Sequence, residues 1–303
     1  MMREVTIVSG KGGTGKTSVT AAFAKLAAEG GHRAVVCDLD VDAADLHLLL
    51  HPDILETTAF SGGKVAVLNP DMCTGCGVCQ TYCRFGAIAE TDDGIRVDAE
   101  LCEGCGVCAR FCRNGAIAMA PRASGRWFRS RTALGPMLHA ELFPGEENSG
   151  LLVSRLREEA HAVYDSGVCD LVLADGPPGI GCPVVSAISG TGFVVIVTEP
   201  TVSGFHDFRR IADLCDHFQR PVGVVLNKAD LDPAIGSAIH EACLARGYAC
   251  LAEIPYSTAV VRGLIDGCSL DEIAADGISV AIAKAWDGVS ASLENLSDKG
   301  LVQ

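Results

Sequence analysis

Residues 5–17 have the sequence VTIVSGKGGTGKT, an apolar run followed by a glycine-rich loop. Val5 to Ser9 has the β-branched composition of a buried strand, and Thr17 to Glu29 has a helical pattern. The loop between them fits G-x4-G-K-[ST], a phosphate-binding pattern that is specific when it joins a strand to a helix. These residues therefore predict an α/β fold with a nucleotide at the start of its first helix.

Each residue type in this loop has a physical part in phosphate binding. Glycines let backbone N–H groups curl around the phosphates, and the helix N-terminus adds its dipole. We expect Lys16 to neutralise β- and γ-phosphate oxygens and Thr17 to offer its hydroxyl to Mg²⁺. The expected nucleotide-binding residues of the loop are Gly10, Lys11, Gly12, Gly13, Thr14, Gly15, Lys16 and Thr17.

The rest of the chain alternates strand and helix patterns around one interruption. We expect strands at 34–38, 64–69, 171–175, 193–198, 222–227 and 250–254, and helices at 151–164, 201–218, 233–246 and from 270 onward. This alternation predicts a mostly parallel, doubly wound sheet formed by residues 1–69 and 122–303. Residues 70–121 are predicted to be an inserted domain, and the arginine-bearing stretch 122–150 a connector.

The predicted insert contains a cysteine repeat with the spacing C-x2-C-x2-C-x3-C, which occurs twice. This is the spacing of bacterial ferredoxins that hold two [4Fe–4S] clusters. We expect the fourth cysteine of each set to begin a helix that points away, and so to bind the other cluster. One cluster would be bound by Cys73, Cys76, Cys79 and Cys112, and the second by Cys102, Cys105, Cys108 and Cys83. Zinc, which also binds Cys-x2-Cys pairs, is the alternative, although it rarely takes three ligands from one short loop.

The amino-acid composition argues against a nucleic-acid-binding protein and against a membrane protein. The 303 residues include 24 Lys plus Arg and 38 Asp plus Glu, which gives a net charge of −14. This charge repels nucleic acid and anionic lipid, and no window approaches the ~20 apolar residues of a membrane span. Because the first residues also lack the apolar stretch of a secretory signal, we expect a cytoplasmic protein with neither nucleic acid nor membrane as a partner.

The cysteine count is high for that compartment, with 15 in the chain. Disulfides do not persist in a reducing cytosol, so abundant thiols there indicate metal or redox chemistry. Most cysteines outside the repeat fall in apolar patterns, where we expect them to be core residues. Cys182 is the exception, because it follows a candidate strand-end motif at Asp175. The cysteines outside the repeat are Cys37, Cys169, Cys182, Cys215, Cys243, Cys250 and Cys268.

An additional lysine in the phosphate loop, Lys11, carries a family resemblance. The sequence KGGTGKT at 11–17 resembles the deviant Walker A loop of MinD/ParA-type P-loop ATPases. Nearly the whole chain resembles members of that group with an inserted two-cluster ferredoxin domain. The resemblance implies that ATP is sandwiched and hydrolysed in a homodimer, with Lys11 reaching the nucleotide of the opposite subunit. Its implied catalytic residues are Lys11, Lys16 and Asp40.

Two aspartate motifs support the same resemblance. Asp38-Leu39-Asp40 resembles the first switch of this family, in which Asp40 would orient the attacking water and Asp38 would support the Mg²⁺ shell. Asp175 begins the sequence DGPPG and resembles a Walker B aspartate followed by the second switch. The resemblance implies that Asp175 holds Mg²⁺ through water. Either aspartate motif alone is weak, because acids at strand ends are often helix caps.

The base of the nucleotide has two expected contacts, Asn227 and Pro255. The family resemblance places Asn227 beside the base, and the loop around Pro255 would form a second wall. Residues 227–230, with the sequence NKAD, also fit the N-K-x-D pattern that recognises guanine in GTPases. The resemblance favours ATP.

These parts together predict an ATPase that couples nucleotide-driven dimer switching to electron transfer through two [4Fe–4S] clusters. A redox partner protein would then exchange electrons with the clusters. One alternative is an iron–sulfur carrier that delivers clusters to an acceptor protein. Another is a positioning or assembly ATPase whose clusters only sense redox state. A third cluster, held between two copies of Cys182 in a dimer, is a further alternative, although the bridging cluster of the related nitrogenase iron protein uses two cysteines per subunit and no second candidate stands out in this sequence.

Overall fold

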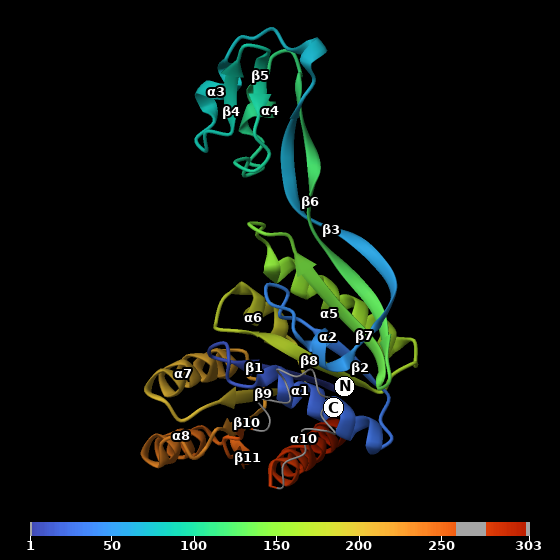
Figure 1. Cartoon of the computed structure of the whole chain (residues 1–303), viewed down its shortest axis with the longest axis vertical. Helices are drawn as coiled ribbons and strands as arrows, with labels where there is room; N and C mark the ends of the chain where they lie inside the picture. The colour runs from blue at the N-terminus through green and yellow to red at the C-terminus, as the bar shows by residue number, and fades with distance from the viewer. Residues whose placement is uncertain (1, 259–276, 301–303) are drawn as a thin grey trace. The chain divides into compact units, whose positions relative to one another are not determined.

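The computed structural model describes residues 2–258 and 277–300, and the chain divides into two compact units (Figure 1). The sheet unit consists of Met1–Thr58, Trp127–Glu141 and Ser149–Gln303. The cysteine unit consists of Ala59–Arg126 and Leu142–Asn148, a range that includes residues 70–121. Two long strands, β3 (Asp53–Leu68) and β6 (Ile117–Thr132), each begin in one unit and end in the other.

A nine-stranded sheet has the strand order β11-β10-β9-β1-β8-β2-β7-β6-β3. From β11 to β7, neighbouring strands run parallel, which confirms the predicted mostly parallel α/β sheet. Its remaining strands are β1 (Glu4–Ser9), β2 (Ala34–Asp38), β7 (Gly135–Leu142), β8 (Leu171–Pro178), β9 (Phe193–Thr198), β10 (Val222–Asn227) and β11 (Ala249–Ile254).

Helices cover both faces of the sheet because its central strands are apolar on both sides. In β1, Val5 and Ile7 face a core cluster that includes Phe23 and Trp286, whereas Val8 faces a second cluster. The helices are α1 (Lys16–Glu29), α2 (Leu46–Leu50), α5 (Ser149–Asp165), α6 (Cys182–Ile188), α7 (Val202–His217), α8 (Pro233–Arg246) and α10 (Ile278–Gly300). Among the described residues, no helix is both long and apolar enough to cross a membrane.

Strands occupy much of the connector that was predicted at 122–150. β6 continues to Thr132, and β7 begins at Gly135 after a short turn. In β6 the exposed Arg129 and Arg131 alternate with the buried Ser130 and Thr132. The prediction was wrong because small hydroxyl side chains take the inward positions here, so the two-residue period carries no hydrophobic signal.

The sequence repeat of the cysteine unit is also a backbone repeat. Its helices α3 (Val78–Tyr82) and α4 (Val107–Phe111) follow Gly77 and Gly106, which have left-handed φ angles of 68° and 74°. Strands β4 (Ile88–Thr91) and β5 (Gly94–Val97) form an antiparallel hairpin between them, and a 3₁₀ turn spans Pro70–Met72. Glycine can adopt this φ without strain, so the cysteine loops can turn sharply into each helix.

The fourth cysteine of each set does not begin a helix. Cys83 directly follows α3 and Cys112 directly follows α4, so each helix ends at the fourth cysteine. The third cysteines, Cys79 and Cys108, lie inside the helices. The expected helix start was wrong because the positive-φ glycine before the third cysteine already turns the chain into a helix.

Candidate functional site

The phosphate loop connects β1 to α1 at the carboxyl edge of the parallel strands. Gly15 has φ 91° just before the first helical residue, Lys16, and a Cβ atom there would lie 2.4 Å from Asn227 Nδ2. Glycine alone fits this position. The Thr14 hydroxyl is buried and has no hydrogen-bond partner among the described residues. Buried polar groups are rarely left unpaired, so Thr14 Oγ1 is suited to a bound ligand such as phosphate.

Two aspartates lie side by side at this edge because β2 and β8 pair Asp38 with Asp175. Asp175 is 1% exposed and accepts hydrogen bonds from Thr17 Oγ1 at 2.7 Å and Thr20 Oγ1 at 2.8 Å. Its Oδ1 is also 2.9 Å from Lys16 Nζ. The structure thus brings together a lysine, hydroxyls and a carboxylate, and such oxygen atoms are the ligands that Mg²⁺ prefers.

The segment after β2 holds two aspartates in different surroundings. Asp38 is fully buried and accepts hydrogen bonds from the backbone N–H groups of Asp40 at 3.1 Å and Leu46 at 3.0 Å. Burial, helped by Asp175, raises the pKa of Asp38 well above its usual range. Asp40 Oδ2 is 3.6 Å from Lys16 Nζ, and burial raises the pKa of Asp40 to about 6 against the opposing effect of that lysine. Asp40 therefore has a pKa suited to exchanging a proton near neutral pH.

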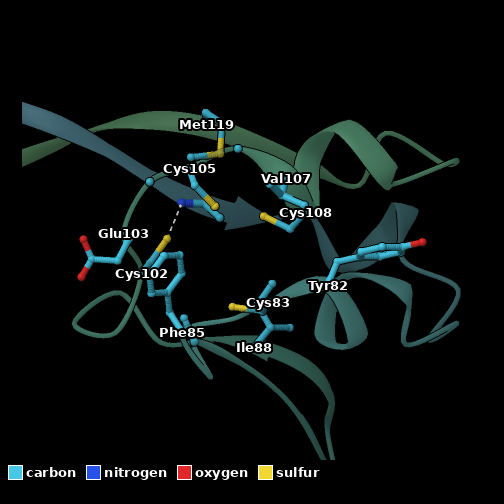
Figure 2. A pocket seen from close by; sticks show the side chains of 14 residues that line it. Tyr82, Cys83, Phe85, Ile88, Cys102, Glu103, Cys105, Val107, Cys108 and Met119 are labelled. Carbon is cyan, nitrogen blue, oxygen red and sulfur yellow. Dashed lines mark hydrogen bonds between the residues drawn. The ribbon is translucent and has the colours of Figure 1, made fainter.

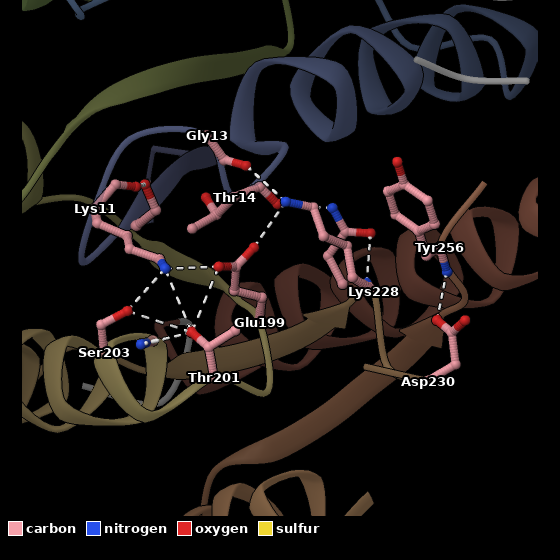
Figure 3. Close-up of polar contacts among 12 residues, drawn as sticks. Lys11, Gly13, Thr14, Glu199, Thr201, Ser203, Lys228, Asp230 and Tyr256 are labelled. Atoms are coloured by element: carbon pink, nitrogen blue, oxygen red, sulfur yellow. Dashed lines mark hydrogen bonds and ion pairs between the residues drawn. The ribbon is translucent and has the colours of Figure 1, made fainter. Parts of the chain in front are cut away.

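On the expected base side, Asn227 contacts the phosphate loop. Its Nδ2 donates to the carbonyl oxygen of Thr14 at 2.7 Å. Asp230 does not face the loop in this way, because its Oδ1 accepts a hydrogen bond from the Tyr256 backbone N–H at 2.6 Å (Figure 3). Pro255 is exposed in the same segment as Tyr256. The structure therefore connects the NKAD segment to the loop that contains Pro255.

Lys11 is held by side chains of its own chain (Figure 3). Its Nζ is 2.6 Å from Glu199 Oε1 and donates to Ser203 Oγ at 3.0 Å and to Thr201 Oγ1 at 3.3 Å. Glu199 Oε2 also accepts from Lys228 Nζ at 2.7 Å. Burial raises the pKa of Glu199, but hydrogen bonds from Lys11 and Lys228 outweigh it and leave that pKa lowered. A charged Glu199 therefore fixes two lysines beside the phosphate loop.

The eight repeat cysteines line two cavities, four in each. Figure 2 shows the first, where Cys83, Cys102, Cys105 and Cys108 turn their sulfur atoms toward a common space. This cavity has about 340 Å³ free of protein atoms, part of it open to solvent. A second cavity of about 330 Å³ is lined by Cys73, Cys76, Cys79 and Cys112. In both cavities the fourth cysteine of one set lies with the first three of the other.

The cysteines are also much of the hydrophobic core of their unit. Cys79, Cys102 and Cys108 are buried in one cluster with small aliphatic residues such as Ile88 and Ile117. Among the described residues, no group of three or more His, Cys, Asp or Glu side chains is arranged to hold a single metal ion. Occupation of the two cavities by iron–sulfur clusters therefore stays a prediction, developed below.

Comparison with known proteins decides the family of the sheet unit. Residues 5–269 match the family model of the CobQ/CobB/MinD/ParA nucleotide-binding domain. The chain belongs to this family. Over 232 residues it is 32% identical to the uncharacterized protein MJ0578 of Methanocaldococcus jannaschii, a match that covers 77% of this chain and 80% of the relative.

Solved structures of this family share the fold. The septum site-determining protein MinD of Pyrococcus horikoshii, in complex with Mg-ADP, matches with a TM-score of 0.57 at 18% identity, over 95% of this chain and 96% of that one. Cobyrinic acid a,c-diamide synthase of Mycobacterium smegmatis, with a bound ATP analogue and magnesium, has a TM-score of 0.51 at 15% identity, over 97% and 96% of the two chains. The chain is thus a nucleotide-binding α/β domain of the MinD/ParA type.

Sequence reasoning missed two polar residues of this nucleotide-binding domain. Glu199 follows β9 directly and Thr20 lies one turn into α1, yet both contact expected site residues. An acid directly after an apolar strand was a usable signal for Glu199, because Asp38 likewise lies at the carboxyl end of its strand, β2. Thr20 gave no such signal, since a hydroxyl inside a helix often bonds its own backbone.

Cys182 is exposed at the first residue of α6, as expected for a residue outside the core. Of the other cysteines outside the repeat, Cys37, Cys169, Cys215 and Cys243 are buried, in agreement with the expected core positions. Cys250 is exposed, so the core position expected for it is wrong. Cys268 lies outside the described residues.

Proposed function

We propose that this chain is an Mg²⁺-dependent ATPase that couples its nucleotide state to electron transfer through two [4Fe–4S] clusters. It would act as an ATP-dependent homodimer and exchange electrons with a redox partner protein. One observation carries the proposal: a single chain contains a phosphate loop facing paired aspartates and two cavities with four cysteines each. A phosphate site does not require iron–sulfur clusters, and clusters do not require a phosphate site. The proposal therefore rests on the presence of both in one chain.

The nucleotide half rests on the contacts around Asp175. Thr17 Oγ1 and Asp175 Oδ2 are 2.7 Å apart. Together with the phosphates they would hold Mg²⁺, and Asp38 would support its water shell. Lys16 Nζ would move from the aspartates to the β- and γ-phosphate oxygens. Asp40, with its raised pKa, would orient and deprotonate the attacking water. The family's solved complexes with Mg-ADP and with an ATP analogue and magnesium support this assignment.

Lys11 is the residue through which two copies would meet. In the single chain its ammonium group is paired with Glu199 and two hydroxyls. To reach the nucleotide of a second copy, Lys11 would exchange the Glu199 carboxylate for phosphate, which keeps its charge paired in both states. Glu199 would remain paired with Lys228, 2.7 Å away. The Lys11 ammonium group would therefore have a negatively charged partner both before and after the exchange.

The cysteine half rests on the two cavities. Four thiolates around a cavity of about 330 or 340 Å³ suit a four-iron cluster, and the division follows the crossed pattern expected from bacterial ferredoxins. When bound, such clusters supply one-electron storage and transfer. Cys102 Sγ accepts a hydrogen bond from the Ala66 N–H at 3.5 Å and Cys112 Sγ one from the Ala116 N–H at 3.2 Å. Such hydrogen bonds to sulfur stabilise the more negative, reduced state.

A series of contacts leads from the aspartates to a strand shared by both units. Asp38 accepts from Leu46 N–H at the start of α2, and His47 of α2 stacks on His139 of β7 with ring centroids 5.9 Å apart. His139 stacks in turn on Phe128 of β6 at 4.7 Å. A shift of α2 on nucleotide binding would change the ring contacts that end on Phe128 of β6. β6 continues into the cysteine unit. This is the physical support for coupling.

The decisive experiment is anaerobic purification with iron counting, followed by redox titration with and without Mg-ATP. We expect about eight irons per chain and cluster potentials that shift when Mg-ATP is added. The Lys16→Ala variant should keep its iron and lose the shift. Two results would overturn the coupling: identical potentials and identical electron-transfer rates to an acceptor with and without nucleotide. A chain without iron would overturn the cluster assignment itself.

Cluster delivery is a second candidate, favoured by one observation. Cys76 and Cys105, one in each cavity, are exposed, whereas the other six repeat cysteines are buried or partly buried. An exposed ligand is the natural point of attack for an acceptor thiol. Incubating the iron-loaded protein with an apo-ferredoxin distinguishes the two functions. Transfer that requires Mg-ATP supports delivery, and retention of all iron supports electron transfer.

A further inference from the structure

A group of four side chains lies where α8 meets β11, outside both sites described above. Cys250 and Glu253 are on β11, and His240 and Cys243 are on α8. His240 Nδ1 is 3.2 Å from the sulfur of Cys250, and His240 Nε2 is 2.9 Å from Glu253 Oε1. Cys250 is exposed, so small molecules in solution can reach its sulfur.

The geometry fixes the proton arrangement. With Nε2–H donating to Glu253, the Nδ1 lone pair of His240 faces the Cys250 thiol and can accept its proton. A histidine that is oriented by an acid on one nitrogen and contacts a thiol on the other is the arrangement that activates cysteine nucleophiles. Cys182 makes a natural comparison, because it is also exposed but has no hydrogen bond to a histidine in the described part of the chain.

Cys243 is placed to react with the same sulfur. Its side chain is fully buried next to Cys250, and the two thiols interact. The chain between them folds back tightly, with the Tyr248 N–H donating to the Cys243 carbonyl at 2.9 Å. Burial, and then Cys250, raise the pKa of Cys243 to about 12. Cys243 therefore stays a protonated thiol while Cys250 is the exposed partner.

We propose that Cys250 is a reactive thiol that hydroperoxides modify, with His240 as its base, Glu253 orienting His240, and Cys243 as the thiol that closes a disulfide. This modification site is independent of the nucleotide and cluster functions proposed above. It assigns a role to four side chains that neither function uses. It would also join the end of α8 covalently to β11.

The chemistry balances in two steps. First the Cys250 thiol gives its proton to His240, and the thiolate attacks one peroxide oxygen: the S–O bond forms, the O–O bond breaks, and the leaving alkoxide or hydroxide takes the proton from His240. Second the Cys243 sulfur attacks the Cys250 sulfenic acid: the S–S bond forms, the S–O bond breaks, and hydroxide leaves as water with the Cys243 proton. Two thiols are oxidised by two electrons, and one peroxide is reduced.

The first test compares two exposed thiols in one protein. The full-length, iron-loaded chain is treated anaerobically with limiting iodoacetamide, and the labelling rates of Cys250 and Cys182 are measured by peptide mass spectrometry. We expect Cys250 to react about tenfold faster, because a free thiol is only a few per cent ionised at neutral pH. His240→Gln should lower the Cys250 rate to that of Cys182 and leave Cys182 unchanged. Equal rates in the wild type, or no effect of the substitution, would overturn the proposal.

The second test isolates the role of Cys243. One equivalent of hydrogen peroxide should give a Cys243–Cys250 cross-linked peptide in the wild type. In Cys243→Ser, the Cys250 sulfenic acid should instead be trapped by dimedone. Oxidation of wild-type Cys250 to sulfinic acid without a cross-link would overturn the assignment of Cys243. Circular dichroism checks that both variants fold, and neither readout depends on ATP hydrolysis or on cluster potential.

Discussion

In the sheet unit the side chains that face the phosphate loop contact one another through hydrogen bonds and ion pairs, whereas in the cysteine unit the candidate ligands are part of the hydrophobic core. Asp175 contacts the side chains of Thr17, Thr20 and Lys16. By contrast, Cys79, Cys102 and Cys108 are buried in the core cluster of their unit and also line the two cavities. The phosphate site is therefore held together by contacts among its own side chains, whereas we expect the cysteine unit to depend on bound clusters for its stability.

Iron removal should destabilise the cysteine unit and leave the sheet unit intact. A core made of cluster ligands loses its centre when the metal leaves, because metal-binding free energy is then folding free energy. We expect chelation under reducing conditions to accelerate protease cleavage within 59–126 by about 100-fold or more, and to leave cleavage of the sheet unit unchanged. Limited proteolysis with mass spectrometry measures both in one sample. Unchanged cleavage of the cysteine unit would show that its stability does not depend on bound iron.

Lys16→Ala should lower ATP turnover by the sheet unit and leave the cysteine unit unchanged. The substitution removes the ammonium group that lies 2.9 Å from Asp175, and kcat/KM for ATP should fall by about 10²- to 10³-fold. Lys25→Ala is the matched control, because Lys25 is on the same helix in an exposed i,i+4 pair with Glu29. It should change turnover by less than about twofold. Iron content should be equal in both variants; loss of iron in Lys16→Ala would show that the two sites are not separable.

Acid should weaken the sheet unit through His139. Burial, and then His47, lower the pKa of His139 to about 4, and its Nε2 is 2.9 Å from Ser130 Oγ. Between pH 6.5 and 4 the unfolded chain binds a proton that the folded chain does not, so stability is lost as pH falls through that window. From pH 7 to 4.5 the loss from this group is about 2 to 3 kcal/mol.

Tryptophan fluorescence can measure the stability of the sheet unit by itself. Trp127 and Trp286 are the only two in the sequence, and both belong to the sheet unit. Denaturant unfolding followed by their fluorescence at several pH values therefore reports on that unit. His139→Gln, which keeps a polar partner for Ser130, should remove the extra loss below pH 6.5. If wild type and variant have parallel pH profiles, the buried histidine is not the acid-sensitive group.

The regular part of the fold could be predicted because local signals mark its elements. β9 and β10 are uninterrupted apolar runs, and α8 starts at Pro233 and stops before Gly247, so the predicted bounds of these elements match the structure. The end of β6 escaped prediction because its buried side chains there, Ser130 and Thr132, are polar. The pairing of the aspartates was implied by their strand-end positions, which parallel pairing aligns.

Contacts between distant residues could not be predicted from local pattern. Glu199 meets Lys11 across 188 residues, and Cys250 meets His240 because α8 folds back on β11. Such pairs depend on the register of the sheet and on helix packing, which residue spacing does not encode. The crossed division of the cysteines between the two cavities could be predicted, because the duplicated spacing is that of two-cluster ferredoxins, in which the fourth cysteine of one set binds the other cluster.

Asp230→Ala should have only a small effect on nucleotide binding. In the structure this carboxylate accepts a hydrogen bond from the Tyr256 backbone N–H at 2.6 Å, so it ties the loop that contains Tyr256 to the end of β10. Its loss should loosen the adjacent loop and weaken ATP and GTP alike by about three- to fivefold, close to 1 kcal/mol. Calorimetric titration with each nucleotide measures the two affinities. Asp232→Asn, which keeps the cap of α8, is the control. Loss of GTP binding alone would mean that Asp230 recognises guanine.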